Sequence, residues 1–196
     1  MKLSAKQQTS RQAQRVLHDF SLALRDLLPQ QEFERMTVND LCTAANYPRS
    51  TFYNYFEDKY DLLNYAAGQV IVRLDFDALK TLPEAAILVA AFDRIYQLID
   101  AHRDYVTRVL TRNAECRARS GLSDYLLATV RKTFVDSFKT KGQLPTELLI
   151  DHCFATILLV LRWIFVDEHD VGLDEAHRYL ASLYGTTLIS GGNEIG

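Results

Sequence analysis

The segment from Arg49 to Phe56 concentrates side chains that donate and accept hydrogen bonds. Its eight residues include one guanidinium, two hydroxyls, one amide and two phenols. Phe52 and Phe56 lie four residues apart, so in a helix they share one face and leave the polar groups on the other. Such groups reach phosphates and base edges in a DNA major groove. The residues alone also allow a polar helix that packs on a neighbouring domain.

The residues before this segment predict the elements that would position it. Thr37 and Asp40 have the spacing of a capping box and indicate the start of a short helix. Asn46 is suited to a left-handed turn residue between that helix and the polar segment. Apolar residues at steps of three and four from residue 11 to residue 28 predict a longer amphipathic helix ahead of both. Three helices in this order are typical of a helix-turn-helix, which we place in residues 1–56.

The composition predicts that the remaining chain is helical as well. The 196 residues are 48% hydrophobic and 24% charged, and they include only eight glycines and four prolines. So few chain-turning residues disfavour many-stranded sandwiches and barrels. None of the prolines interrupts an apolar pattern of helical period. We therefore expect an all-α protein of about nine helices, in which a larger helical domain, residues 57–196, follows the helix-turn-helix.

The net charge of −3 at first argues against a nucleic-acid partner, because DNA binding depends on lysine and arginine. The charges are unevenly distributed, however. Residues 1–56 hold seven basic and five acidic residues, a net charge of +2, whereas residues 57–196 hold fifteen and twenty, a net charge of −5. The acidic total belongs to the second domain and does not exclude DNA.

The sequence from Thr37 to Leu63, TVNDLCTAANYPRSTFYNYFEDKYDLL, resembles the DNA-binding signature of tetracycline-repressor (TetR) type regulators. The resemblance covers about the first third of the chain, and its most specific part is STFYNYF followed by Lys59. Three positions depart from the family pattern: Asn46 stands where the family favours Gly, Cys42 where it favours Ala, and Glu57 where it often has Pro. All three changes are structurally conservative.

The resemblance implies a role for each matching position. The arginine, the hydroxyls and the amide of the second short helix would contact bases or nearby phosphates, and its two tyrosines would contact the DNA backbone. Thr37 would meet a phosphate where the first short helix begins, and Lys59 would face the phosphate backbone where the next long helix begins. The implied DNA-binding residues are Thr37, Arg49, Ser50, Thr51, Tyr53, Asn54, Tyr55 and Lys59. Family members of this kind act as homodimers on operators with approximate two-fold symmetry, more often as repressors than as activators.

The residues of the last two predicted helices independently indicate dimerisation. The helix expected from Pro145 to Val166 is apolar around its whole circumference, so one face serves its own core and another is available to a partner. The final helix adds an apolar seam. The residues expected at the dimer interface are Phe154, Leu158, Leu161, Phe165, Leu173, Ala176, Leu180 and Leu183. The alternative is a central helix buried wholly within its own domain.

The resemblance also implies a small-molecule effector that enters a cavity among the middle helices. Such a ligand shifts the separation of two DNA-reading domains only by binding one arrangement better than the other. The candidates are polar or aromatic side chains on these helices: His102, Tyr105, Tyr125, His152, Arg162 and Trp163. For each of them, capping, interface pairing or exposure to solvent is the alternative.

Several other classes of protein are disfavoured. The five histidines and three cysteines show no spacing typical of a metal site, and no paired catalytic groups or glycine-rich phosphate loop occur, so we expect no cofactor and no enzyme. The chain begins without a secretory signal, and its longest uncharged apolar stretch, Cys153–Leu161, falls short of the roughly 20 residues of a membrane span. We therefore expect a cytoplasmic transcription regulator. The alternative function is a DNA-bound helical adaptor whose second domain is controlled by a protein partner.

Overall fold

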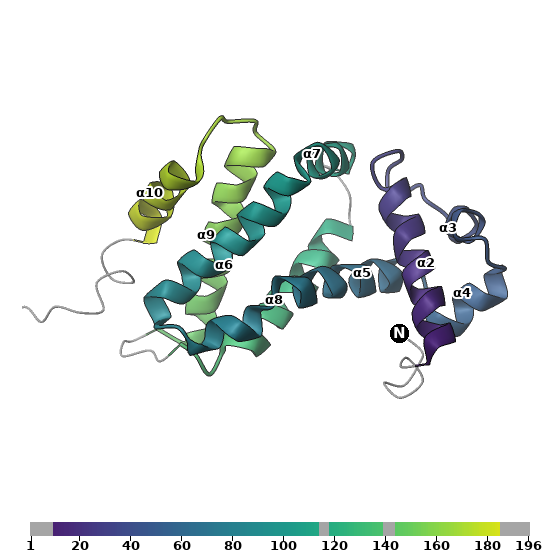
Figure 1. Ribbon diagram of the computed structural model, residues 1–196, viewed down its shortest axis with the longest axis horizontal. Helices are drawn as coiled ribbons and strands as arrows, with labels where there is room; N and C mark the ends of the chain where they lie inside the picture. The colour runs from purple at the N-terminus through teal and green to yellow at the C-terminus, as the bar shows by residue number, and fades with distance from the viewer. Residues whose placement is uncertain (1–9, 114–117, 139–143, 185–196) are drawn as a thin grey trace, which may run out of the picture. The chain divides into compact units, whose positions relative to one another are not determined.

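The structure is a computed structural model that describes residues 10–113, 118–138 and 144–184 (Figure 1). These residues form nine α-helices and one 3₁₀ helix, and none of them forms a strand. In chain order the helices are α2 (Arg11–Leu27), α3 (Val38–Ala45), α4 (Arg49–Tyr55), α5 (Lys59–Leu74), η1 (Phe76–Thr81), α6 (Glu84–Ala101), α7 (Arg103–Arg112), α8 (Ala118–Phe134), α9 (Thr146–Phe165) and α10 (Leu173–Tyr184). The predicted all-α fold is confirmed.

The chain divides into two compact units. The first takes in residues 1–70 and 108–125, and the second takes in residues 71–107 and 126–196. Helices α5, α7 and α8 each contribute residues to both units. The predicted division into a DNA-binding domain, residues 1–56, and a ligand-sensing and dimerisation domain, residues 57–196, stays a prediction.

The core of the first unit is built around Phe20 on α2. This side chain is fully buried, and its ring lies 5.3 Å from that of Phe52 and 6.0 Å from that of Phe56, both edge-on. Edge-to-face aromatic pairs add to the stabilisation that burial provides. The apolar side of α4 is therefore anchored on α2, and α3 packs against both helices.

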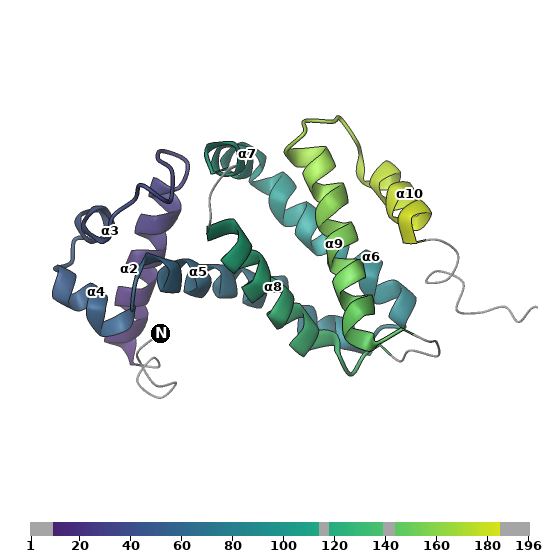
Figure 2. The ribbon, with the colours of Figure 1, turned by 180° about the vertical axis from the view of Figure 1, so that it is seen from behind.

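The core of the second unit lies between α6, α9 and α10. Both ribbon views show α6 and α9 side by side, with α10 next to them (Figures 1 and 2). Phe92 on α6, Ile164 on α9 and Ala176 on α10 are completely buried at the centre. By length and composition alone α9 could cross a membrane, but eight of its 20 residues are buried within this unit. We interpret α9 as the core helix of a folded domain.

The middle of the chain differs in detail from the sequence prediction. No helix boundaries are predicted above for this region, where α7 ends at Arg112 and α8 begins at Ala118. The sequence prediction also missed η1. It follows Asp75, whose left-handed backbone (φ 48°) breaks the chain direction directly after α5. A single left-handed residue leaves no periodicity that a sequence pattern could show.

Candidate functional site

The turn between α3 and α4 is set by Asn46 and Tyr47. Asn46 adopts the left-handed conformation (φ 58°, ψ 44°) at the end of α3, as its residue type predicts. The backbone N–H of Tyr47 donates to the carbonyl of Cys42 at 3.0 Å. The Tyr47 hydroxyl donates to Asp19 Oδ2 on α2 at 2.9 Å, and this bond raises the pKa of the phenol. The turn is thereby tied to the longest helix of the first unit, and it fixes the direction in which α4 leaves.

Helix α4 has the two faces that its sequence predicts. Phe52 and Phe56 are 0% exposed. Six polar side chains occupy the rest of the helix, and four of them are exposed: Arg49, Ser50, Tyr53 and Asn54. The remaining two, Thr51 and Tyr55, are half-buried, and Tyr55 packs against the core of the first unit. The exposed face of α4 is therefore rich in hydrogen-bonding groups and poor in charge.

Arg49 and Tyr53 form a pair one helical turn apart on this face. Arg49 Nη2 donates to Tyr53 Oη at 3.3 Å, and the guanidinium carbon lies 5.8 Å from the centre of the tyrosine ring. A guanidinium placed over an aromatic ring is held by a cation–π attraction. The pair leaves other N–H groups of Arg49 available for base edges or phosphates.

Thr37 and Asp40 form the predicted capping box at the start of α3. The backbone N–H of Asp40 donates to Thr37 Oγ1 at 3.1 Å, and the backbone N–H of Thr37 donates to Asp40 Oδ2 at 2.8 Å. The Thr37 hydroxyl donates to the same carboxylate oxygen at 2.8 Å. Both hydrogen bonds that the Asp40 carboxylate accepts from Thr37 lower its pKa, and the bond from the backbone N–H has the larger effect. The Thr37 hydroxyl proton is therefore already committed within the protein.

Lys59 lies at the start of α5, but its ammonium group points into the protein. Nζ donates to the carbonyl oxygens of Phe33 at 2.8 Å, Glu34 at 2.7 Å and Met36 at 2.9 Å. An ammonium group has three donors, and three carbonyls accept from this one. This geometry gives Lys59 a structural role, and its expected contact with the phosphate backbone stays a prediction. The sequence could not show this, because the three acceptors are at least 23 residues away along the chain.

The first unit is thus a helix-turn-helix that presents a polar, exposed second helix, which is the class of a DNA-binding regulator. Residues 23–66 match the profile of the family described as bacterial regulatory proteins, tetR family. This match covers 44 of the 196 residues and shows that the N-terminal part of the chain resembles the DNA-binding domain of TetR-family transcription regulators. A comparison with curated protein sequences finds no match.

Several solved structures share the fold over nearly the whole chain. The transcriptional regulator FadR from Bacillus subtilis, in complex with stearoyl-CoA, is 18% identical with a TM-score of 0.59, over 90% of this chain and 99% of that one. The fatty acid degradation regulator FadR from Bacillus halodurans is 14% identical, with a TM-score of 0.57. The match covers 91% of this chain and 97% of that one. A Vibrio parahaemolyticus protein described as a putative TetR-family regulator is 18% identical, with a TM-score of 0.53. The match covers 86% of this chain and 96% of that one. At these identities the likeness establishes the fold of both units.

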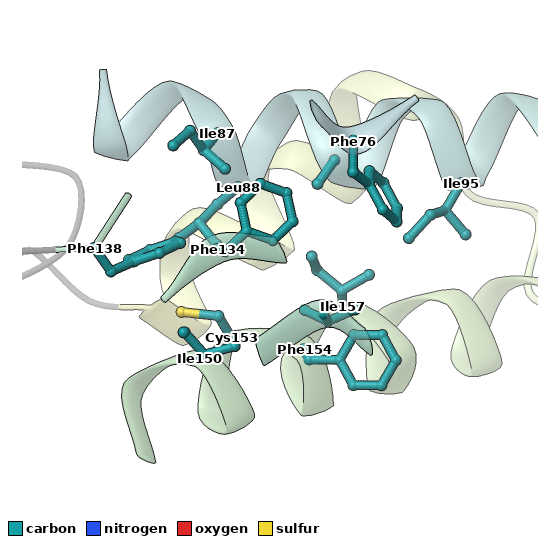
Figure 3. A pocket seen from close by; sticks show the side chains of 12 residues that line it. Phe76, Ile87, Leu88, Ile95, Phe134, Phe138, Ile150, Cys153, Phe154 and Ile157 are labelled. Carbon is teal, nitrogen blue, oxygen red and sulfur yellow. The ribbon is translucent and has the colours of Figure 1, made fainter. Parts of the chain in front are cut away.

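The second unit contains an apolar cavity between α6, α8 and α9 (Figure 3). About 410 Å³ of empty space lies in and in front of it, open solvent included, and only about 30 Å³ of this could hold the centre of a water molecule. Figure 3 shows Leu88 of α6, Phe134 of α8 and Cys153 of α9 converging on it. The twelve lining residues are Phe76, Ile87, Leu88, Ala91, Ile95, Val130, Phe134, Phe138, Ile150, Cys153, Phe154 and Ile157. Apart from the Cys153 thiol, these side chains are hydrocarbon, so the cavity favours an apolar guest.

None of the six ligand candidates from the sequence lines this cavity. Tyr105 and Tyr125 are half-buried elsewhere, and His102 is exposed at the end of α6. The other three, His152, Arg162 and Trp163, lie exposed on the outer face of α9, where Trp163 stacks on His169 with ring centres 3.7 Å apart. The polar residues that interrupt α9 mark its exposed face, and the role of the six candidates in ligand binding stays a prediction. The lining residues look like ordinary core positions in the sequence and carry no separate signal.

The eight residues expected at the dimer interface differ in burial within one chain, and their place in an interface stays a prediction. Leu161, Phe165, Ala176 and Leu180 are at most 4% exposed, and all four belong to the core of their own unit. Phe154 and Leu173 are half-buried, whereas Leu158 and Leu183 are exposed. A helix that is apolar all round has an inward and an outward stripe of the same composition. The pattern therefore shows that two stripes exist but not which one faces outward.

Within the described ranges, no group of three His, Cys, Asp or Glu side chains is arranged to hold a metal ion.

One polar residue that the sequence did not point to is Asn113, which follows α7 and contacts the loop between α2 and α3. A lone asparagine some 80 residues from its partners has no sequence motif.

Proposed function

We propose that the protein is a homodimeric repressor that reads a two-fold symmetric DNA operator with α4 and is released by a ligand with a long apolar chain. The observation that carries this proposal is the exposed face of α4, where Arg49, Ser50, Tyr53 and Asn54 stand on a helix anchored by Phe52 and Phe56. Exposed hydrogen-bonding groups on the second helix of such a motif read base edges and phosphates. A repressor of this kind acts in the cytoplasm.

Selection of bound sequences from random duplex DNA tests the DNA-reading part. Each chain carries one α4, so a dimer contributes two copies related by a two-fold axis. The enriched sequences are expected to contain two inverted half-sites about one helical turn apart, centre to centre. Enrichment of no inverted repeat would contradict the proposal.

The exposed faces of α9 and α10 support the dimer. Leu148, Leu158, Leu159 and Trp163 on α9 and Leu183 on α10 are exposed large apolar residues. Leu159 is 57% exposed and Trp163 is 46% exposed, although both belong to the most apolar helix of the chain. A group of exposed apolar side chains on adjoining helices is typical of an interface with another protein.

Analytical ultracentrifugation of Leu159→Glu tests that face. The wild-type protein is expected to sediment with the mass of two 22.4 kDa chains. The Leu159→Glu variant is expected to sediment as a single chain, because a carboxylate would be buried without a partner in the interface. The matched control is Val72→Glu, which changes an exposed apolar residue of α5 and should leave the dimer intact. A wild-type mass of one chain at micromolar concentration would contradict the dimer.

The apolar cavity supports the proposed class of effector. Its lining offers contacts to hydrocarbon but no hydrogen-bonding partner beyond a thiol. The FadR structure from Bacillus subtilis holds stearoyl-CoA, a molecule with a long hydrocarbon chain. We therefore propose a fatty acid or an acyl-CoA thioester as the effector, with its hydrocarbon chain in the cavity.

A chain-length series tests this class. Octanoyl-, lauroyl- and stearoyl-CoA share a headgroup, so differences in their affinity report on the hydrocarbon chain. Burying a methylene contributes about 0.8 kcal/mol, so affinity should rise about fourfold per added methylene until the cavity is filled. Coenzyme A without an acyl chain is the control and should not bind. Equal affinities along the series would contradict the proposal.

A cavity-filling variant locates the binding site. Ala91→Phe places a large side chain at a residue that lines the cavity, and it should abolish binding of stearoyl-CoA. Val89→Phe adds a similar volume to the exposed side of the same helix and should leave binding unchanged. The alternative function, an adaptor controlled by a protein partner, would gain support if neither substitution altered operator release.

A further inference from the structure

Asn113 makes three hydrogen bonds with its side chain. Oδ1 accepts from the backbone N–H of Phe33 at 2.7 Å. Nδ2 donates to the carbonyl oxygens of Leu28 at 3.3 Å and Val109 at 2.9 Å. Both donors of the carboxamide are therefore in use, and reversing its oxygen and nitrogen would place an N–H against the N–H of Phe33.

Two of these bonds hold the loop between α2 and α3. Leu28 directly follows α2, and Phe33 lies in the middle of the loop. The Phe33 side chain is 1% exposed, and its carbonyl accepts from Lys59 at the start of α5. The Lys59 ammonium also lies 5.0 Å from the centre of the Phe33 ring. The backbone N–H of Phe33 is thus held by Asn113 and its backbone carbonyl by Lys59.

The loop leads directly into the DNA-reading helices. Met36, the third carbonyl partner of Lys59, is followed by Thr37, the N-cap of α3. Lys59 itself follows α4 by four residues, at the point where α5 begins. The position of this loop therefore constrains both ends of the segment that contains α3 and α4.

We propose that Asn113 is a positioning residue of the DNA-reading unit, which fixes the loop between α2 and α3 and thereby the orientation of α3 and α4 for operator binding. The residue lies outside the family match at residues 23–66, although the compact first unit includes it. The DNA-reading unit is accordingly completed by a residue that follows α7. The consequence for operator affinity rests on the proposed function.

Hydrogen exchange at the Phe33 amide tests the contact without DNA. In Asn113→Ala this amide should exchange at least tenfold faster than in the wild-type protein, because its acceptor is gone. The amide of Leu24, in the core of the same unit, should be unchanged. Asn113→Asp retains an acceptor for Phe33 but loses both donated bonds, so Phe33 should keep most of its protection. Equal exchange at Phe33 in the wild type and in Asn113→Ala would overturn the proposal.

Two comparisons keep the experiment decisive. Thr111→Ala removes an exposed side chain from the end of α7 and should leave Phe33 protected. If Asn113→Ala does not fold, the wild-type protein still gives an answer: the side-chain amide protons of Asn113 should exchange more slowly than those of exposed Asn39. Equal rates for the two carboxamides would overturn the proposal.

Operator affinity tests the consequence. On a duplex recovered by selection, Asn113→Ala should bind at least fivefold more weakly than the wild type, and Thr111→Ala should bind equally well. Unchanged affinity in Asn113→Ala, with Phe33 unprotected, would show that the loop does not control α3 and α4. If the wild-type protein selects no sequence, the proposed function fails, and exchange at Phe33 still decides whether Asn113 holds the loop.

Discussion

Asn46 occupies the left-handed turn position between the two helices of the motif. A β-branched residue is strained in this conformation, whereas glycine accepts it freely. We expect Asn46→Val to lower the free energy of unfolding by about 1–2 kcal/mol. Asn46→Gly should leave it nearly unchanged. Urea unfolding of the wild type and both variants measures the difference, and equal stability of the valine and glycine variants would show that the turn is not constrained.

The capping carboxylate Asp40 makes the start of α3 sensitive to acid. Its pKa is lowered in the folded protein, mainly by the backbone N–H of Thr37. A lowered carboxyl pKa contributes stability above the ordinary pKa of about 3.9, and this stability is lost as the pH falls through the folded value. Asp40→Asn should therefore cost about 0.3–1 kcal/mol at pH 7. Below the folded pKa it should cost less.

Unfolding experiments at neutral and acidic pH measure this difference. Asn39→Asp is a matched control, because it adds a carboxylate to the neighbouring exposed position in the first turn of α3, outside the capping box. A stability loss in Asp40→Asn that is independent of pH would contradict the role of the ionised carboxylate.

The residues that act locally were predictable from the sequence, and those that act at a distance were not. Thr37, Asp40 and Asn46 act on backbone groups within a few positions of themselves, so their types and spacing predicted their roles. Lys59 acts on carbonyls at least 23 residues away, and two of the three bonds of Asn113 join groups 80 and 85 residues away. Only the folded chain brings these groups together.

At the scale of elements, the two faces of α4 have different tasks. Tyr53 is 38% exposed, whereas its neighbour Phe52 is fully buried. Tyr53→Ala should weaken operator binding and leave the helical content and the unfolding midpoint nearly unchanged. Phe52→Ala should cost about 3–5 kcal/mol of stability, because it opens a cavity beside Phe20.

Gel-shift titration together with thermal unfolding separates the two effects. Loss of operator affinity in Tyr53→Ala without loss of stability supports a direct contact with DNA. Unchanged operator affinity would remove Tyr53 from the DNA-binding face.

Helices α4 and α9 show why one element was easier to interpret than the other. The polar and apolar residues of α4 separate cleanly, so the sequence predicted its buried face. Helix α9 is apolar on several sides, and the inward stripe, with Leu161 and Ile164, has the same composition as exposed Leu158 and Leu159. Periodicity assigns a face only where two faces differ in polarity.

At the scale of the whole molecule, the charge distribution bears on how the protein binds DNA. The net charge of residues 1–56 is only +2, and the ammonium of Lys59 is occupied by three carbonyls. Each phosphate that a cation neutralises adds about 0.9 to the slope of log affinity against log salt concentration. We expect a shallow salt dependence, and we expect Lys59→Gln to leave the slope unchanged even where it weakens binding. A smaller slope in Lys59→Gln would instead assign Lys59 to a phosphate.

The central claim is that the exposed face of α4 reads DNA sequence. The most direct test repeats the selection from random duplex DNA with Arg49→Ala and with Asn54→Ala, and compares the preferred sequences with those of the wild type. A side chain that reads a base contributes about 1–3 kcal/mol of discrimination at that position. We predict that at least one variant loses its preference at one position in each half-site, symmetrically about the two-fold axis. Wild-type preferences retained at every position by both variants would contradict the account.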